Sequence, residues 1–453
     1  MSLNDLSPLA GKSSALMRNS TPVQAFLWGE FAINIGRGYL LIAFTQLLYR
    51  GSGGLWHNLF YVASDAFFAF AVPFIAGAWV DRHGCGVLLS RSALTQCALL
   101  LLCAAGAAAG WLSPGGVLGA SLVTSALNAS VRVCVFTLTP ALAPVEGLMR
   151  INGRQQVAFQ SGNLAGVLLA GVLLDRLGTA ASFLMTGVCT ALAACCYARA
   201  AVVDRAAGMG LPTHNPRAGF LQLAPALIRK PMLLALFALG AGDLVAVSIF
   251  NLTLPVLIAR HFGGRSLALA GVDSAFTLGS VLLGWVVGRY ALKGRQLHTL
   301  LLLMPLALGG FELQTVWFDQ WVCVGLAFCT GVFVAAYSVY FSATVQALVP
   351  SSLRGRFAAL RRMVSTTIVA GASYSFTLGY AHDGLRGANV VSLSIAVVVL
   401  ATCTLWIIRR RVLRTQIAAV TVTALEHDEH ADLAPLFEPF IHFASADRRR
   451  QVR

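Results

Sequence analysis

Charged and amide side chains occur inside several long apolar stretches of this sequence. Glu30, Asn34 and Arg37 follow one another at intervals of four and three residues, which places them on one face of a helix. Asn128 and Arg132 repeat the four-residue spacing in a later stretch. A guanidinium stays charged and can hold a carboxylate through two parallel hydrogen bonds. The pattern therefore favours the binding of an anionic small molecule.

Acidic residues in the same kind of stretch are candidates for carrying a proton. Burial in apolar surroundings favours the neutral form of a carboxyl group, which can then take up and release a proton near neutral pH. We expect this role for Glu30, Asp243 or Glu312. A structural role is the alternative, because Glu30 and Arg37 could pair with each other and Arg132 could extend to the membrane surface.

Two more residues complete the predicted binding set. Asn251 and Tyr337 lie in later apolar stretches and could line the same cavity as the arginines. For Tyr337, packing is the simpler explanation, because an aromatic side chain in a helix more often fills a core.

The segments that carry these side chains are predicted to cross a membrane. Of the 453 residues, 57% are hydrophobic and 11% are charged, whereas a soluble domain has roughly 25% charged residues. Apolar runs of about 20 residues recur along the chain, and each is long enough to span a bilayer as a helix. The runs do not alternate in polarity, which favours helices over a membrane barrel. Nearly all of the ten cysteines fall in these runs without the spacing of metal ligands or a disulfide framework.

The apolar windows predict an all-α membrane protein with twelve transmembrane helices in two six-helix bundles. The first set is expected near residues 24–48, 58–80, 92–112, 116–141, 157–175 and 180–200. The second set is expected near 231–258, 267–290, 297–318, 321–348, 363–381 and 388–408. The predicted organisation is a cytoplasmic N-terminus (1–21), an N-terminal bundle (22–201), a cytoplasmic linker (202–230), a C-terminal bundle (231–408) and a cytoplasmic tail (409–453).

The net charge of +15 is interpreted as a topology signal rather than as a sign of nucleic-acid binding. Most Lys and Arg residues fall in short connections on one side of the predicted helices, and we count the group around Arg361 among them. Such a bias places both termini and the linker in the cytoplasm of a multi-pass protein of the cytoplasmic (inner) membrane. The polar N-terminal stretch, which contains Asp5, does not look like a cleaved signal peptide.

The stretch AGAWVDRHGCGVLLSR at 76–91 follows the second predicted helix. Its Gly77, Asp81, Arg82 and Gly84 resemble the loop between helices two and three of the major facilitator superfamily, although Gly86 stands where that family often has a basic residue. Gly77 would let two helices approach closely, and Gly84 would permit a tight turn. The resemblance implies that Asp81 holds one conformation until transport breaks its contact. The alternative is a simple cytoplasmic anchor.

Further segments resemble the enterobactin-exporter and macrolide-efflux group of that superfamily, over roughly residues 22–408. In the first half the resemblance rests on Thr139, Pro140, Ala141, Leu142, Leu148 and Met149. In the second half it rests on Gln346, Pro350, Arg354, Gly355 and Arg356. Gly162, Gly166 and Gly171 resemble the antiporter motif of exporters in the superfamily, with Val167 where proline is usual. Plain close packing of two helices would also explain these glycines.

The resemblance implies a secondary transporter, not an enzyme, that works by alternating access around a site between the bundles. The resemblance and the two arginines together favour export of a siderophore of the carboxylate type, driven by proton antiport. A multidrug or macrolide efflux pump is the alternative, and a membrane sensor that acts through the tail is a third possibility. The expected partners are a small molecule, a proton and the lipid bilayer. Nucleic acid and a cofactor are not expected, and the chain is expected to be a monomer.

The sequence favours neither ATP-driven transport nor a metal site. The sequence has no match to the phosphate-binding pattern Gly-x-x-x-x-Gly-Lys-Ser/Thr, so ATP-driven transport is not expected. The acidic and histidine residues at 427–432 could bind a metal, but a solvated charged tail is the simpler interpretation.

Overall fold

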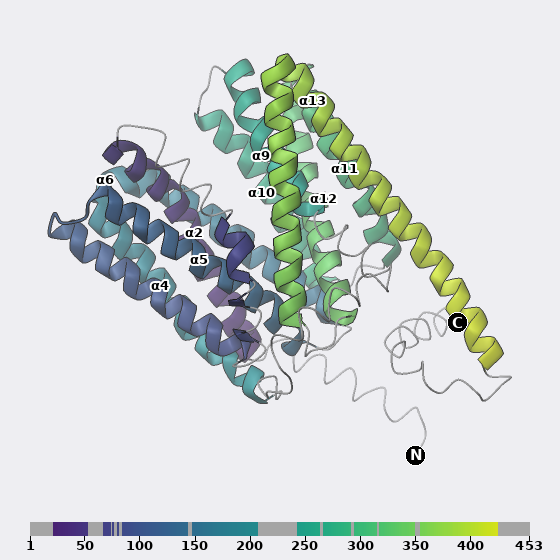
Figure 1. Cartoon of the computed structure of the whole chain (residues 1–453), viewed down its shortest axis with the longest axis horizontal. Helices are drawn as coiled ribbons and strands as arrows, with labels where there is room; N and C mark the ends of the chain where they lie inside the picture. Colours follow the sequence, from purple (N-terminus) through teal and green to yellow (C-terminus); the bar gives the residue numbers. More distant parts are fainter. Residues whose placement is uncertain are drawn as a thin grey trace.

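The computed structural model describes eleven stretches of the chain, and within them the regular structure is helical, with no β-strand. The described residues are 21–52, 67–73, 75–76, 79–80, 84–143, 147–206, 242–262, 266–290, 294–314, 317–348 and 354–424. The helices form two bundles that lie side by side, one from each half of the chain (Figure 1).

The first bundle contains four long described helices. They are α2 (Thr21–Ser52), α4 (Cys85–Ala108), α5 (Pro114–Leu138) and α6 (Leu148–Ala206), with the short 3-10 turn η2 (Thr139–Ala141) after α5. Pro114 starts α5, and the Ser113 hydroxyl caps it by accepting a hydrogen bond from the Gly116 N–H at 3.2 Å. Within α6, Gly178 has a φ of 76°, so the segment is two helices joined at a residue where glycine is favoured. This break separates the predicted spans 157–175 and 180–200.

The second bundle has a similar construction. Its helices are α9 (Gly242–His261), α10 (Ser266–Arg289), α11 (Gly294–Leu313), α12 (Gln320–Leu348) and α13 (Arg354–Ala424). The backbone of α13 leaves the helical conformation at Asp383 and at Gly384, which has a φ of 58°. This turn separates the predicted spans 363–381 and 388–408, and the second helix continues past 408 to Ala424.

The predicted architecture of membrane-spanning helices in two bundles is confirmed. Among the described residues, five helices are long and apolar enough to cross a membrane: Cys85–Ala108, Pro114–Ala141, Gly178–Ala201, Gly271–Arg289 and Gln320–Gln346. Shorter apolar helices are Gly242–Leu254, Leu302–Leu313 and Arg386–Thr402. The predicted span 58–80 is described only in part, and residues 67–73 of it are helical. The tail residues 427–432 lie outside the described part of the chain.

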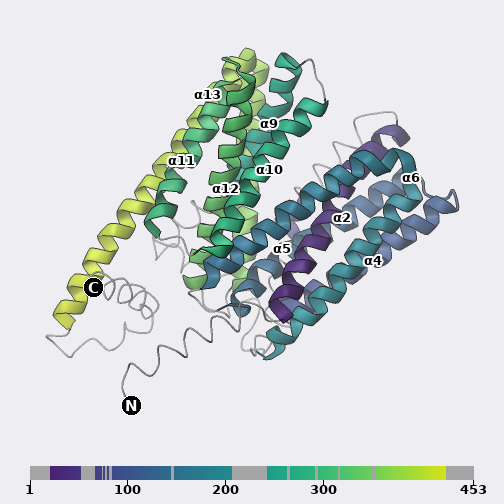
Figure 2. The same cartoon turned by 180° about the vertical axis from the view of Figure 1, so that it is seen from behind.

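Each bundle has its own apolar core. In the second bundle the ring of Phe250 stacks on Phe276, with their centres 4.7 Å apart, and lies tilted against Phe311, with their centres 4.6 Å apart. In the first bundle Phe26, Leu138 and other buried side chains form another cluster, which Ala343 and Ala358 of the second bundle join where the bundles meet. The bundles converge at the end where α2 begins and diverge toward the opposite end (Figures 1 and 2).

Glycines allow the closest helix contacts inside the second bundle, and Gly331 of α12 gives a test of this packing. A Cβ at Gly331 would collide with the carbonyl oxygen of Phe276 in α10. We expect Gly331→Ala to lower the free energy of unfolding by about 1–3 kcal/mol, because the two backbones must move apart. The measurement is the thermal transition of the purified protein in detergent.

Gly325 provides the matched control on the same helix. Nothing lies within 4 Å of a Cβ placed there, so Gly325→Ala should leave the transition temperature unchanged or slightly raised. Equal destabilisation by both substitutions would contradict the close approach of α10 and α12.

Candidate functional site

Five of the predicted site residues line one small cavity in the first bundle. The cavity lies between α2 and α5 and is bordered by Glu30, Ile33, Asn34, Arg37, Asn128, Val131 and Arg132. The volume in which the centre of a water molecule can lie is about 10 Å³. The cavity therefore has room for about one water. The helical spacing in the sequence predicted that these polar groups share a face, and the structure brings the two faces together.

Arg132 is held by groups from two other helices. Its Nη2 donates a hydrogen bond to Asn34 Oδ1 at 3.2 Å, and its guanidinium lies 4.2 Å from the centre of the Phe159 ring in α6. Asn34 is itself fixed, because its Nδ2 donates to the backbone oxygen of Glu30 at 2.6 Å. Arg132 therefore points into the bundle, where a cation on an aromatic face keeps its charge and its remaining donors.

Glu30 is the buried acidic group of this site. Its carboxylate accepts a hydrogen bond from the Tyr197 hydroxyl of α6 at 2.6 Å, and only 1% of the residue is exposed. Arg37 also acts on this carboxylate through an attractive Coulomb interaction. Tyr197 was not singled out from the sequence, because it is separated from Glu30 by 167 positions and lies in a largely apolar stretch.

Asp243 forms a second site with Arg361, which was predicted to lie in a connection between helices. Asp243 Oδ2 lies 3.7 Å from Arg361 Nη2 of α13, and the Arg361 side chain is only 14% exposed. The Arg361 guanidinium also lies 4.1 Å from the centre of the Phe341 ring. Arg361 therefore does not lie in a connection between helices, and that prediction was wrong. Helix α13 begins at Arg354, so Arg361 lies two turns inside the helix and on its packed face.

The other predicted residues of the second bundle lie at different places. The Tyr337 hydroxyl borders Gly242, where a Cβ would meet it at 2.5 Å, so Tyr337 belongs with the Asp243 site. Glu312 is buried in α11 and accepts a hydrogen bond from the Thr253 hydroxyl at 2.8 Å. Asn251 is an exposed residue of α9. The structure therefore does not bring all of the predicted binding residues into a single cavity.

The glycine motifs are explained by local packing where they are described. Gly84 has a φ of 84° at the start of α4, and its N–H donates to the Val80 carbonyl oxygen at 3.0 Å, which is the tight turn predicted. Gly77, Asp81 and Arg82 lie outside the described residues.

In α6, Gly162 and Gly166 face α2. A Cβ at either position would collide with the carbonyl oxygen of Phe31 or Ile35. Gly171 lies further along the same helix. Close helix packing accounts for the first two positions.

Buried amides join the two bundles at the end where they converge. Asn152 Nδ2 of α6 donates to Gln346 Oε1 of α12 at 2.7 Å, and Gln346 Nε2 donates to the carbonyl oxygen of Phe136 in α5 at 3.0 Å. We call Asn152 and Gln346 the inter-bundle amide pair. Asn152 was not singled out from the sequence, because a neutral amide near a helix end gives no charge signal.

Helices α6 and α10 meet beside the amide pair. A Cβ at Gly153 would lie 2.8 Å from the Gly288 nitrogen and 2.9 Å from the Gly284 oxygen. The backbones therefore touch without intervening side chains. Arg361 adds a further contact across the bundles, since its guanidinium lies 5.6 Å from the centre of the Phe136 ring.

Two bundles of long apolar helices with ionisable groups buried inside them are typical of multi-pass membrane transporters. The sequence model of the Major Facilitator Superfamily matches residues 26–374, and the chain belongs to this family. Members of the family are transporters of small molecules, often with proton coupling, and are not enzymes. The search of curated proteins found no match to the chain.

Several solved structures share the fold. A bacterial homologue of the iron transporter ferroportin, in an outward-facing state, is 15% identical with a TM-score of 0.67 and covers 85% of this chain and 99% of its own. The human organic anion transporter MFSD10 is 14% identical with a TM-score of 0.64, over 84% of this chain and 99% of its own. The fucose:proton symporter of E. coli is 15% identical with a TM-score of 0.60, over 85% and 98%. At these identities the likeness establishes the fold alone.

Proposed function

We propose that the protein exports a carboxylate-bearing small molecule, of the siderophore class, across the cytoplasmic membrane by alternating access. The observation that carries the proposal is the cavity in which Arg37 and Arg132 lie together with two amide side chains. A substrate carboxylate would replace the Asn34 amide as the acceptor for Arg132, while Phe159 keeps the guanidinium plane in place. The exchange is favourable because a charged acceptor forms a stronger hydrogen bond than a neutral one.

The orientation of the bundles supports an outward-facing conformation. The bundles converge at the end where α2 begins, which the distribution of basic residues assigns to the cytoplasm. Both termini are then cytoplasmic, and the diverging ends of the bundles face outward. The similar ferroportin homologue was solved in an outward-facing state.

The charge interaction between a bound anion and each acidic side chain favours one of these side chains as the proton carrier. An anion bound beside Glu30 would favour the protonated form of Glu30, so substrate and proton would bind together at that site. Antiport requires that the proton and the substrate act in opposition. We therefore assign the counter-transported proton to Asp243, because its protonation removes the ion pair with Arg361 between α9 and α13. That ion pair lies beside the contacts that hold the bundles together, so its loss favours their separation.

The proposal is tested in a producing strain that lacks this gene. We expect siderophore to accumulate in the cytoplasm and to fall in the medium, and the wild-type gene should restore secretion. Asp243→Asn should restore it about five-fold less well, which is the size of a modest coupling free energy. Asp319→Asn is the matched control, because exposed Asp319 only caps α12 through the Trp321 and Val322 N–H groups.

Two outcomes would count against the proposal. Unchanged siderophore secretion together with greater macrolide sensitivity of the deletion strain would favour a drug efflux pump. Full secretion by Asp243→Asn would show that Asp243 does not carry the counter-transported proton. Glu312 would then be the next candidate for that role.

A further inference from the structure

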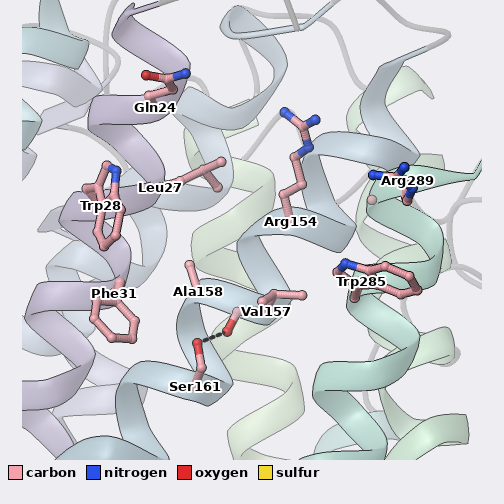
Figure 3. A pocket seen from close by; sticks show the side chains of 11 residues that line it. Gln24, Leu27, Trp28, Phe31, Arg154, Val157, Ala158, Ser161, Trp285 and Arg289 are labelled. Carbon is pink, nitrogen blue, oxygen red and sulfur yellow. Dashed lines mark hydrogen bonds between the residues drawn. The ribbon is translucent and has the colours of Figure 1, made fainter. Parts of the chain in front are cut away.

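A groove on the outside of the helices lies where the two bundles meet. Helix α6 forms its floor, α2 one wall and α10 the other (Figure 3). Its volume is about 490 Å³, within the range of small-molecule pockets. It is separate from the arginine cavity, since the two share no lining residue.

The groove is polar at one end and mostly apolar along the rest of its length. Gln24, Arg154 and Arg289 lie toward one end of the groove, and Phe31 and Ser161 lie toward the other end (Figure 3). Seven residues separate Gln24 from Phe31 and Arg154 from Ser161, which is about 10 Å along each helix axis. The groove therefore presents two guanidinium groups at one level and an apolar surface about 10 Å below them.

Two tryptophans mark the sides of the groove and face outward. Trp28 of α2 is 63% exposed and Trp285 of α10 is 51% exposed. Both rings border the space between the helices (Figure 3). Tryptophan is enriched where the hydrocarbon of a bilayer meets its headgroups, because the indole has an apolar body and one donor.

We propose that the groove is a binding site for an acidic phospholipid, such as phosphatidylglycerol. The phosphate lies between Arg154 and Arg289, and the first part of an acyl chain lies against Trp28, Phe31 and Trp285. Charge complementarity selects an anionic headgroup, because the polar end offers guanidinium donors. The apolar length selects a lipid over a soluble anion, because a soluble anion would leave the exposed surface of both tryptophans uncovered. The charge distribution predicts that this end faces the cytoplasmic leaflet, where anionic lipids attract basic residues.

The lipid would also favour one arrangement of the bundles. Helices α2 and α6 belong to the first bundle and α10 to the second, so both walls exist only while α6 and α10 are in contact. A Cβ at Gly288 would lie 2.9 Å from Arg154 Cγ, so the glycine allows Arg154 to lie directly across α10. A ligand that binds one arrangement better than another shifts the population toward it. Bound lipid therefore stabilises the conformation in which the bundles converge at this end.

Lipid binding is measured by native mass spectrometry of the purified full-length protein in detergent, titrated with phosphatidylglycerol or phosphatidylcholine. We expect tighter binding of phosphatidylglycerol. Arg289→Gln should weaken that binding about five-fold, the effect of removing one basic group at a membrane surface. Arg91→Gln is the control, since Arg91 is an exposed residue of α4 outside the groove. The transition temperature of each variant without lipid shows that it is folded.

A second measurement places the acyl chain. In detergent with few lipids per protein, brominated phosphatidylglycerol should quench tryptophan fluorescence, and Trp285→Phe should remove part of that quenching. Trp321→Phe should not, because exposed Trp321 of α12 is not in the groove.

Any one of four results would overturn the lipid site. They are equal binding of the two lipids, unchanged binding by Arg289→Gln, displacement of the lipid by inorganic phosphate, or quenching that Trp285→Phe does not reduce.

Discussion

Replacing Arg132 with alanine is expected to lower export of a carboxylate substrate about ten-fold or more. A hydrogen bond between charged partners contributes about 1.5–3 kcal/mol, which corresponds to at least that factor. The side chain makes the contacts with Asn34 and Phe159 that aim it into the bundle. The measurement is the efflux of a radiolabelled citrate-based siderophore from loaded cells that express each variant.

The series also separates the charge of Arg132 from its shape. Arg132→Lys keeps a positive charge but loses the planar fork and its stacking, so its efflux should be intermediate. Arg91→Ala, at an exposed position of α4, should match wild type. Wild-type efflux by both Arg132 variants, at equal amounts of protein in the membrane, would show that Arg132 does not hold the substrate.

Gly153→Leu is expected to abolish transport while each bundle stays folded. The leucine side chain would occupy the place where α6 meets the backbone of α10 at Gly284 and Gly288. The affected contact lies between bundles, not within a core, so its loss prevents closure at this end without opening a bundle. Transport is measured as above, and folding is checked by the thermal transition.

Accessibility at the closing end gives a second readout for the same variant. Ala343 is 5% exposed in α12 and packs against the first bundle's core, so Ala343→Cys should react faster with a thiol reagent when Gly153→Leu is present. Gly271→Leu is the control on α10, because nothing lies within 4 Å of a Cβ there. Normal transport by Gly153→Leu would show that the cycle does not need the contact between α6 and α10.

The helices were predictable from the sequence because membrane crossing imposes both a length and a composition. Apolar windows between charges and glycines located the spans, and the turn at Gly178 falls between two of them. The spacing of Glu30, Asn34 and Arg37 likewise fixed which side chains share a face. Those features are local, so a single sequence contains them.

The partners of the site residues depend on how the helices rotate against one another, which local spacing does not determine. Tyr197 reaches Glu30 from α6, and Arg361 reaches Asp243 from α13. Both contacts join distant segments. Asn251 and Asp243 lie on the same helix eight residues apart, which is about 80° around the axis. That rotation leaves Asp243 buried and Asn251 exposed. From the sequence alone, both were predicted to belong to the site.

The neutrality of the inter-bundle amide pair has a consequence for how the membrane potential can influence this protein. A voltage does work only on net charge that moves through it, about 2.3 kcal/mol per elementary charge per 100 mV. Asn152, Gln346 and the Phe136 carbonyl carry none, so the potential does not pull directly on these hydrogen bonds, in contrast to the charged Arg361 that contacts the Phe136 ring nearby. Any voltage dependence of the cycle must arise from the ionic groups, the cargo and the proton.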